Sequence, residues 1–168
     1  MAPAAVLVGP PGAGKTTVGK AVAELLGVPF ADTDHLIAQR AGKPIPEIFF
    51  DDGEQTFRAL ERETIAEALT SFDGVLALGG GAILDSDTRE ALHPHTIVFL
   101  SVELPDAVKR VGLGAGRPLL SVNPRATLKY LMEERRPLYT SVATHTVHTD
   151  GRPPEEIATE LAGLLKVG

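Results

Sequence analysis

The chain has 168 residues, a length typical of one domain with a substantial hydrophobic core. Hydrophobic residues make up 43% and charged residues 23% of it, and its formal net charge of −6 disfavours a general binder of nucleic acids or anionic membranes, which needs a basic surface. Cysteine is absent, which excludes disulfides, thiolate metal sites and cysteine nucleophiles.

The first predicted elements are a strand, a glycine-rich loop and a helix. An apolar run at 4–8 precedes Gly9-Pro10-Pro11-Gly12-Ala13-Gly14-Lys15-Thr16, which fits the pattern G-x-x-x-x-G-K-[ST], and an amphipathic helical pattern begins at Lys15. Small residues let backbone N–H groups approach a phosphate chain, and the start of a helix adds further donors and its dipole. We therefore expect Lys15 to reach the β- and γ-phosphates of a nucleotide, and the Thr16 hydroxyl to bind Mg²⁺.

The predicted second strand, 28–31, ends at Asp32-Thr33-Asp34. In open α/β sheets, ligands bind at the carboxyl ends of the strands, so one carboxylate can face the nucleotide metal and the other a second substrate. Alternatively these residues cap a helix, because Asp and Thr begin helices well and a helical pattern follows. The two roles can coexist.

A short helix is expected within 42–53, and a longer one over 54–69. The apolar stripe of the longer helix includes Phe57 and Ile65, and Arg58 lies beside this stripe with Glu61 one turn on. Periodicity alone favours a solvated ladder of charges at Arg58, Glu61 and Arg62.

The predicted third strand, 75–78, is apolar on both faces, as expected of an interior parallel strand, and continues into Gly79-Gly80-Gly81. Three glycines allow another group to approach the backbone closely and offer unhindered N–H donors. They are equally consistent with a flexible turn before a helix near 85–92.

A fourth strand at 96–100 and a helix over 105–111 are followed by a different kind of segment, about 112–124. It is rich in glycine and carries Arg117, which suits a mobile lid that closes over phosphates and delivers one positive charge. A plain surface loop is the competing interpretation.

The next predicted helix runs from Arg125 to about Arg136, where Pro137 is expected to end it. Arg135 falls on its inner face, seven residues after Leu128, whereas Arg136 points to the side. An inward arginine needs an anion, because burying an unpaired charge is costly. Arg135 is therefore the better ligand candidate of the two.

A last strand near 146–149 and a C-terminal helix with Ile157 and Leu161 inward complete the pattern. Strands and helices alternate throughout, which predicts an α/β fold of three layers, with a five-stranded parallel sheet and helices on both faces. We expect a single domain over 1–168.

In combination, these motifs resemble the shikimate kinase family over nearly the full length of the chain. The motifs are the phosphate loop, Asp32-Thr33-Asp34, Asp52-Gly53-Glu54-x-x-Phe57-Arg58-x-x-Glu61, Leu78-Gly79-Gly80-Gly81, Arg117-Pro118-Leu119-Leu120 and Arg135-x-Pro137-Leu138-Tyr139. The resemblance implies a P-loop, nucleoside-monophosphate-kinase-like fold. It also implies ATP-dependent phosphorylation of the shikimate 3-hydroxyl, with Mg²⁺, in aromatic amino-acid biosynthesis.

The resemblance also assigns roles to individual residues. The implied catalytic residues are Lys15, Asp34 and Arg117. The implied ATP-binding residues are Gly12, Ala13, Gly14, Lys15, Thr16, Thr17, Arg110, Arg117 and Arg152, with Pro154 beside the adenine. The metal would be held by Thr16 and Asp32. The implied substrate-binding residues are Asp34, Arg58, Glu61, Gly79, Gly80, Gly81 and Arg135, with the segment of about 32–62 as the main substrate-binding region.

In these roles, Arg58 and Arg135 pair with the substrate carboxylate and Glu61 orients Arg58, which replaces the solvated ladder that periodicity favours. Because Arg135 and Arg136 are adjacent, the resemblance leaves open whether Arg135 or Arg136 is the second arginine that binds the substrate. Asp34 holds the ring hydroxyls, and whether it also acts as the base stays open.

Two other functions are compatible with the phosphate loop. One is a different small-molecule kinase, such as a gluconate or nucleoside-monophosphate kinase, but the set Asp34, Arg58, Gly80 and Arg135 suits a small polyhydroxy carboxylate. The other is a nucleotide-binding regulatory module without turnover, but no catalytic group is missing. We expect a monomer that binds neither nucleic acid nor membranes. The N-terminus lacks a signal-peptide pattern and no run is as long as a membrane span, so a cytoplasmic location is expected.

Overall fold

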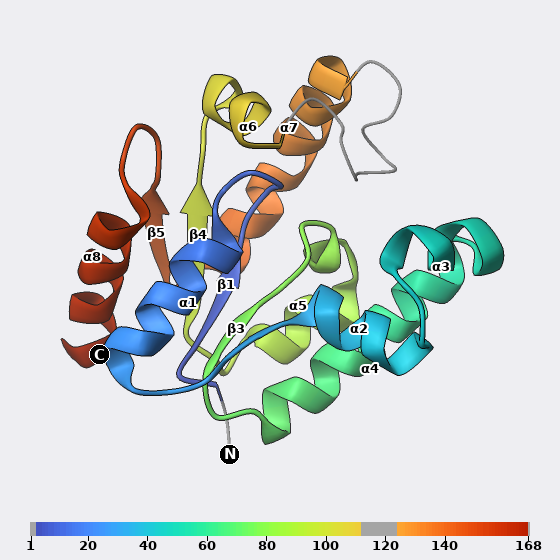
Figure 1. The fold of residues 1–168 in the computed structure, drawn as a ribbon, viewed down its shortest axis with the longest axis horizontal. Helices are drawn as coiled ribbons and strands as arrows, with labels where there is room; N and C mark the ends of the chain where they lie inside the picture. The colour runs from blue at the N-terminus through green and yellow to red at the C-terminus, as the bar shows by residue number, and fades with distance from the viewer. Residues whose placement is uncertain (1–2, 112–123, 168) are drawn as a thin grey trace.

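A computed structural model describes residues 3–111 and 124–167 and contains a five-stranded parallel sheet (Figure 1). The strands are β1 Ala5–Val8, β2 Phe30–Asp32, β3 Val75–Ala77, β4 Ile97–Ser101 and β5 His145–His148. Their order across the sheet is β2-β3-β1-β4-β5, and each neighbouring pair is parallel. The predicted sheet is thereby confirmed, with the strand before the phosphate loop at its centre.

Helices pack on both faces of this sheet, as the alternation of elements predicts. They are α1 Lys15–Leu26, α2 Thr33–Ala41, α3 Ile45–Asp52, α4 Glu54–Ser71, α5 Ser86–Leu92, α6 Leu104–Val111, α7 Pro124–Val142 and α8 Pro154–Val167, with a 3₁₀ turn η1 Ala82–Leu84. No helix in the described ranges is long and apolar enough to span a membrane.

The core has two layers because successive strand residues point to opposite faces. In β1, Leu7 packs in a cluster with Val22 of α1 and Leu161 of α8, whereas Val6 packs in a second cluster with Ile65 of α4. Figure 1 shows α1 and α8 side by side on one face of the sheet. Both faces of the interior strands are therefore dry, which explains their continuous apolar runs.

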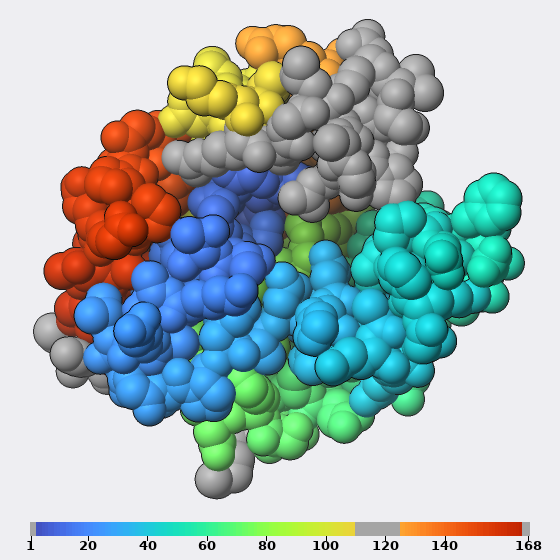
Figure 2. All heavy atoms as spheres, in the orientation of Figure 1, coloured from blue at the N-terminus to red at the C-terminus, as the bar shows by residue number. Residues whose placement is uncertain are grey.

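A third, smaller cluster holds helices α2, α3 and α4 together beside the sheet. Its buried residues are Ile37, Ile48 and Phe57. In Figure 2 the segment of α2 and α3, light blue to cyan, forms a lobe on the opposite side of α1 from the red α8. The segment predicted to bind the substrate therefore has its own hydrophobic support.

Helix α7 is longer than the sequence predicts. Pro137 lies inside the helix, which continues to Val142, so the prediction that Pro137 ends it is wrong. Proline removes one backbone hydrogen bond, but the turn after it is anchored by Tyr139, whose ring stacks on Phe99 with centroids 5.1 Å apart. Burial of this last turn therefore outweighs the local preference of proline.

The sheet register brings three motifs to one edge. Asp32 is opposite Ala77 in the pairing of β2 with β3, and β1 lies on the other side of β3. The residues that follow these three strands are the phosphate loop, Asp32-Thr33-Asp34 and Gly79-Gly80-Gly81. Parallel strands place their carboxyl ends together, so residues far apart in sequence form one site.

Candidate active site

The phosphate loop folds as a cradle that opens on the first turn of α1. Gly14 is the N-cap of this helix with φ of 89°, a left-handed conformation that favours glycine, and it offers no side-chain acceptor to the first-turn N–H groups. Lys15 extends back over the loop, where its ammonium donates to Gly9 O at 2.7 Å and to Pro10 O at 3.1 Å. Backbone donors and one ammonium thus gather where an anion can bind.

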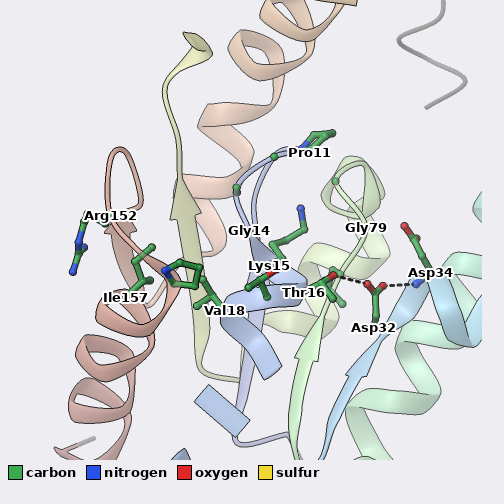
Figure 3. A pocket seen from close by; sticks show the side chains of 16 residues that line it. Pro11, Gly14, Lys15, Thr16, Val18, Asp32, Asp34, Gly79, Arg152 and Ile157 are labelled. Carbon is green, nitrogen blue, oxygen red and sulfur yellow. Dashed lines mark hydrogen bonds between the residues drawn. The ribbon is translucent and has the colours of Figure 1, made fainter. Parts of the chain in front are cut away.

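A chain of hydrogen bonds links the loop to the end of β2 (Figure 3). The Thr16 hydroxyl donates to Asp32 Oδ2 at 3.0 Å, and Asp32 Oδ1 accepts from the Asp34 backbone N–H at 2.9 Å. Asp32 is therefore the N-cap of α2, as one of the two alternatives predicts, and its other oxygen contacts Thr16 at the start of α1.

The oxygens of Thr16 and Asp32 are hard ligands that suit Mg²⁺, which prefers a few protein oxygens together with phosphate and water. In residues 3–111 and 124–167, no group of three or more His, Asp or Glu side chains forms a ready-made metal site. The donor set therefore fits a metal that arrives with a nucleotide better than a permanent protein-bound metal.

One cavity of about 510 Å³ joins these groups to the neighbouring strand ends. The described residues that line it are Pro11, Gly12, Ala13, Gly14, Lys15, Thr16, Thr17, Val18, Asp32, Asp34, Leu78, Gly79, Gly80, Arg152, Pro154 and Ile157. Figure 3 shows Arg152 and Asp34 on opposite sides of the loop. The cavity can therefore hold a long ligand that passes over the phosphate loop, with a second ligand near Asp34.

Arg152 is fixed on the α8 side of this cavity. Its guanidinium pairs with Glu156 at 3.2 Å and with Glu160 at 2.6 Å, and it donates to His148 O at 2.8 Å. These three partners orient an arginine that would otherwise be free to rotate on the surface.

The glycines after β3 are needed for close approach. A Cβ built on Gly79 would lie 2.7 Å from Asp34 Oδ1, and one built on Gly81 would lie 2.6 Å from Arg58 Nη2. A Cβ on Gly80 would lie 3.1 Å from Cδ of Pro11 in the phosphate loop. None of the three has a positive φ. Gly80 and Gly81 do form a turn before η1, and the close approach of Asp34, Pro11 and Arg58 explains why the residues there are glycines.

Arg58 and Glu61 form a partly buried pair. Arg58 Nη1 lies 2.8 Å from Glu61 Oε1, and the Arg58 guanidinium lies over the Phe57 ring, 5.1 Å from its centroid. Only 4% of Glu61 is exposed, so the solvated ladder that periodicity favours is wrong. The physical reason is visible in the spacing, since Glu61 lies four residues after Phe57 and four before Ile65 on the buried stripe.

The pKa of Glu61 depends on its burial and on the charges around it. Burial raises its pKa, and the negative charge of Asp34 adds to this effect, while Arg58 and Arg135 oppose it. Glu61 Oε2 is buried and has no hydrogen-bond partner among the described residues. Two carboxylates and two guanidinium groups thus lie near one another at the edge of the cavity.

Arg135 is buried, with 5% of its surface exposed, as its place on the inner face of α7 predicts. The Arg136 side chain is 43% exposed and lies 3.7 Å from Glu103. The positive charge of Arg135 lowers the Glu61 pKa, so Arg135 belongs to the electrostatic surroundings of Arg58 and Glu61.

Two further residues of the site received no role from the sequence. Thr33 is fully buried and its hydroxyl accepts from the Gly79 N–H at 3.3 Å, while the Tyr139 hydroxyl donates to Gly80 O at 2.5 Å. Tyr139 follows Arg135 by four residues, so helical spacing places both on one face and is the signal that could have identified it.

Two residues that were predicted to bind ATP, Arg117 and Arg110, lie wholly or partly outside the described residues. Arg117 and the predicted lid lie outside the described residues, apart from Pro124 at the start of α7. Arg110 belongs to helix α6, but its side chain is outside the described part of the chain.

Comparison with known proteins places this site in a family. The family model for shikimate kinase matches residues 11–166. The chain is 69% identical to a shikimate kinase of Salinispora arenicola, over 98% of this chain and 99% of that protein. It is 60% identical to a shikimate kinase of Thermobifida fusca, over 95% and 93% of the two chains.

A solved structure agrees closely with the fold described above. The shikimate kinase from Acinetobacter baumannii in complex with shikimate has a TM-score of 0.94 and 39% sequence identity. The match covers 99% of this chain and 94% of that one.

Proposed function

The chain belongs to the shikimate kinase family, and on that premise we propose how its own residues divide the work of transferring the γ-phosphoryl group of ATP to the shikimate 3-hydroxyl. The products are shikimate 3-phosphate and ADP, in aromatic amino-acid biosynthesis. The observation that carries the proposal is the cavity in which the phosphate loop meets Asp34 and Gly79.

The nucleotide side consists of the phosphate loop and the first turn of α1. We assign the backbone of Gly12 to Thr17 to the ATP phosphates, and Lys15 to the β- and γ-phosphates. Thr16 and Asp32 would hold Mg²⁺, which neutralises charge on the phosphate oxygens when it is bound with ATP. Arg152 and Arg110 are proposed to flank the adenine.

The acceptor side consists of the charged cluster beside Gly79. Arg58 and Arg135 are proposed to bind the shikimate carboxylate, because a planar guanidinium can donate two parallel hydrogen bonds to it. Glu61 holds Arg58 in place for this contact, through the 2.8 Å pair. Asp34 is proposed to accept a hydrogen bond from the 3-hydroxyl and to take its proton.

Alignment and charge neutralisation dominate phosphoryl transfer, so proton removal from the hydroxyl can occur late. In this account the main task of Asp34 is to point the hydroxyl oxygen at the γ-phosphorus. The contact of Asp34 with Gly79 limits where that carboxylate can lie, since a Cβ on Gly79 would be 2.7 Å from it.

The wider organisation belongs to the same proposal. We propose one kinase domain over 1–168, an acceptor segment at about 32–62, and a lid at about 112–124 that brings Arg117 to the phosphates. We also propose a cytoplasmic monomer without nucleic-acid partners. Sedimentation of the purified protein tests the monomer, and cell fractionation tests the location.

The direct test of the function is ADP release with ATP and Mg²⁺. Shikimate is compared with quinate, gluconate, CMP and a blank without acceptor. Turnover with shikimate alone is the expected result. Turnover with another acceptor overturns the substrate assignment, and nucleotide binding without turnover points to a regulatory module.

A further inference from the structure

Tyr139 connects three parts of the molecule from a buried position. Its hydroxyl donates to Gly80 O at 2.5 Å, and its ring stacks on Phe99 of β4 with an interplanar angle of 27°. Only 1% of its surface is exposed. A buried tyrosine hydroxyl needs a partner, and here the partner is the backbone of the glycine run after β3.

The carbonyl that Tyr139 holds belongs to a residue between the two halves of the site. Gly80 lies against Pro11 of the phosphate loop, with only 3.1 Å between Pro11 Cδ and a Cβ built on Gly80. On either side, Gly79 lies against Asp34 and Gly81 lies against Arg58. A rotation of the Gly80 peptide would therefore disturb the contacts of both acceptor residues.

Helix α7 places Arg135 one turn before Tyr139 on the same buried face. The tyrosine thus anchors the helix that carries one acceptor arginine, and the strand end that supports the other. Burial raises the pKa of Tyr139 to about 12, which Arg135 and Arg58 oppose, so the hydroxyl stays protonated and donates at any working pH.

We propose that Tyr139 is a positioning residue for acceptor binding, whose hydroxyl fixes the Gly80 peptide so that Asp34, Arg58 and Arg135 face one substrate. It touches neither substrate in this account and acts through Gly80 and through α7. The inference rests on the proposed function, because it assigns the acceptor to the cluster beside Gly79.

The test is Tyr139→Phe, which keeps the ring and its stack on Phe99 but removes the hydroxyl. The substitution removes the bond to Gly80 and the interaction of the hydroxyl with Arg135, which predicts a rise in the shikimate KM of about five- to tenfold. The ATP KM should change by less than about twofold, since the phosphate loop is held by its own backbone contacts. Calorimetric titration with shikimate should give the same loss of affinity as the KM.

Two control variants distinguish the effect of losing the Tyr139 hydrogen bond from the effect of a general loss of stability. Thr144→Val removes another hydroxyl bonded to the backbone, which accepts from the Ile97 N–H at 3.0 Å at the start of β4, away from the site. It should leave both KM values unchanged. Phe99→Leu removes the ring stack but keeps the Tyr139 hydroxyl, so it should lower Tm more than Tyr139→Phe and raise the shikimate KM less.

The proposal is overturned if Tyr139→Phe leaves the shikimate KM at the value of Thr144→Val, or raises both KM values equally. It is also overturned if Phe99→Leu reproduces the same rise, because the role is then packing alone. Unfolding of Tyr139→Phe at the assay temperature overturns it as well, because the hydroxyl is then needed for the fold as a whole. Wild-type protein that fails to phosphorylate shikimate contradicts the proposed function instead, so the two failures are distinguishable.

Discussion

The two halves of the active site are built in different ways. In our proposal the phosphate-binding part of the nucleotide half is one continuous segment, 9–17, whose groups are backbone N–H groups, the Lys15 ammonium and the Thr16 hydroxyl. The acceptor half is assembled from α2, α4, α7 and the glycines after β3, and its groups are side chains held by packing. A local motif therefore specifies phosphate binding, whereas the identity of the acceptor depends on tertiary contacts.

The largest expected effect is on the nucleotide half. Lys15→Ala removes the ammonium that lies over the loop, and kcat should fall by about 10²- to 10³-fold, as for the loss of one preorganised donor. Shikimate affinity, measured by calorimetry without nucleotide, should not change. The matched control is Lys20→Ala, an exposed lysine on the same helix. A loss of shikimate affinity in Lys15→Ala but not in Lys20→Ala would contradict the separation of the two halves.

On the acceptor half, Arg58→Ala should weaken the binding of shikimate and leave the binding of ATP unchanged. Loss of a charge-assisted pair with the carboxylate predicts a rise in the shikimate KM of about 10- to 100-fold, with the ATP KM unchanged in steady-state kinetics. Arg62→Ala is the control, because Arg62 is on the same helix but is 48% exposed and pairs with Asp85 at 2.6 Å. An equal effect of the two substitutions would mean that charge on α4 matters only at long range.

The same substitution of glycine should have opposite consequences in different places. Gly81→Ala places a Cβ 2.6 Å from Arg58 Nη2, so the guanidinium must move, and we expect a rise of about fivefold or more in the shikimate KM. Gly163→Ala on α8 meets no atom within 4 Å. It should raise the free energy of unfolding by about 0.5–1 kcal/mol, measured by thermal or urea unfolding. Unchanged kinetics in Gly81→Ala would contradict the close approach to Arg58.

The smallest expected effect is a pH dependence of stability. Burial raises the folded-state pKa of Glu61 above its value in the unfolded chain, so the folded state binds this proton more tightly than the unfolded state does. Its stabilising contribution is therefore present below the unfolded pKa and is lost as pH rises through the folded pKa.

Glu61→Gln removes this titration. The Tm of the variant minus that of wild type should become more positive as pH rises from about 4.5 towards neutrality. A difference that stays constant or falls over this range would mean that Arg58 and Arg135 fully offset the burial of Glu61.

The contrast between the halves also decides what the sequence could predict. The strand before the phosphate loop, the start of α1 at Lys15 and the alternation of five strands with helices follow from local pattern, and the structure confirms them. The inward position of Arg135 follows from helical spacing as well. The end of α7 does not, because the stack of Tyr139 on Phe99 lies outside any local window.

The acceptor half was harder to predict for the same reason. The glycines at 79–81 looked equally like a turn, since the side chains that press against them come from α2, α4 and the phosphate loop. Glu61 looked solvated because it is charged, although its spacing from Phe57 placed it on the buried stripe. Sequence motifs named these residues through family resemblance, but only the tertiary packing explains why each is needed.

The central claim is that Arg58 recognises the carboxylate of the acceptor, and one calorimetric cycle tests it most directly. Shikimate and its methyl ester, which lacks the negative charge, are titrated into wild type and into Arg58→Ala. We expect the ester to bind wild type about 10-fold or more weakly than shikimate does, and this difference to be several-fold smaller in the variant, where Arg135 alone remains to pair with the carboxylate. If the ester is penalised equally in both proteins, Arg58 does not contact the carboxylate and the account of the acceptor half is wrong.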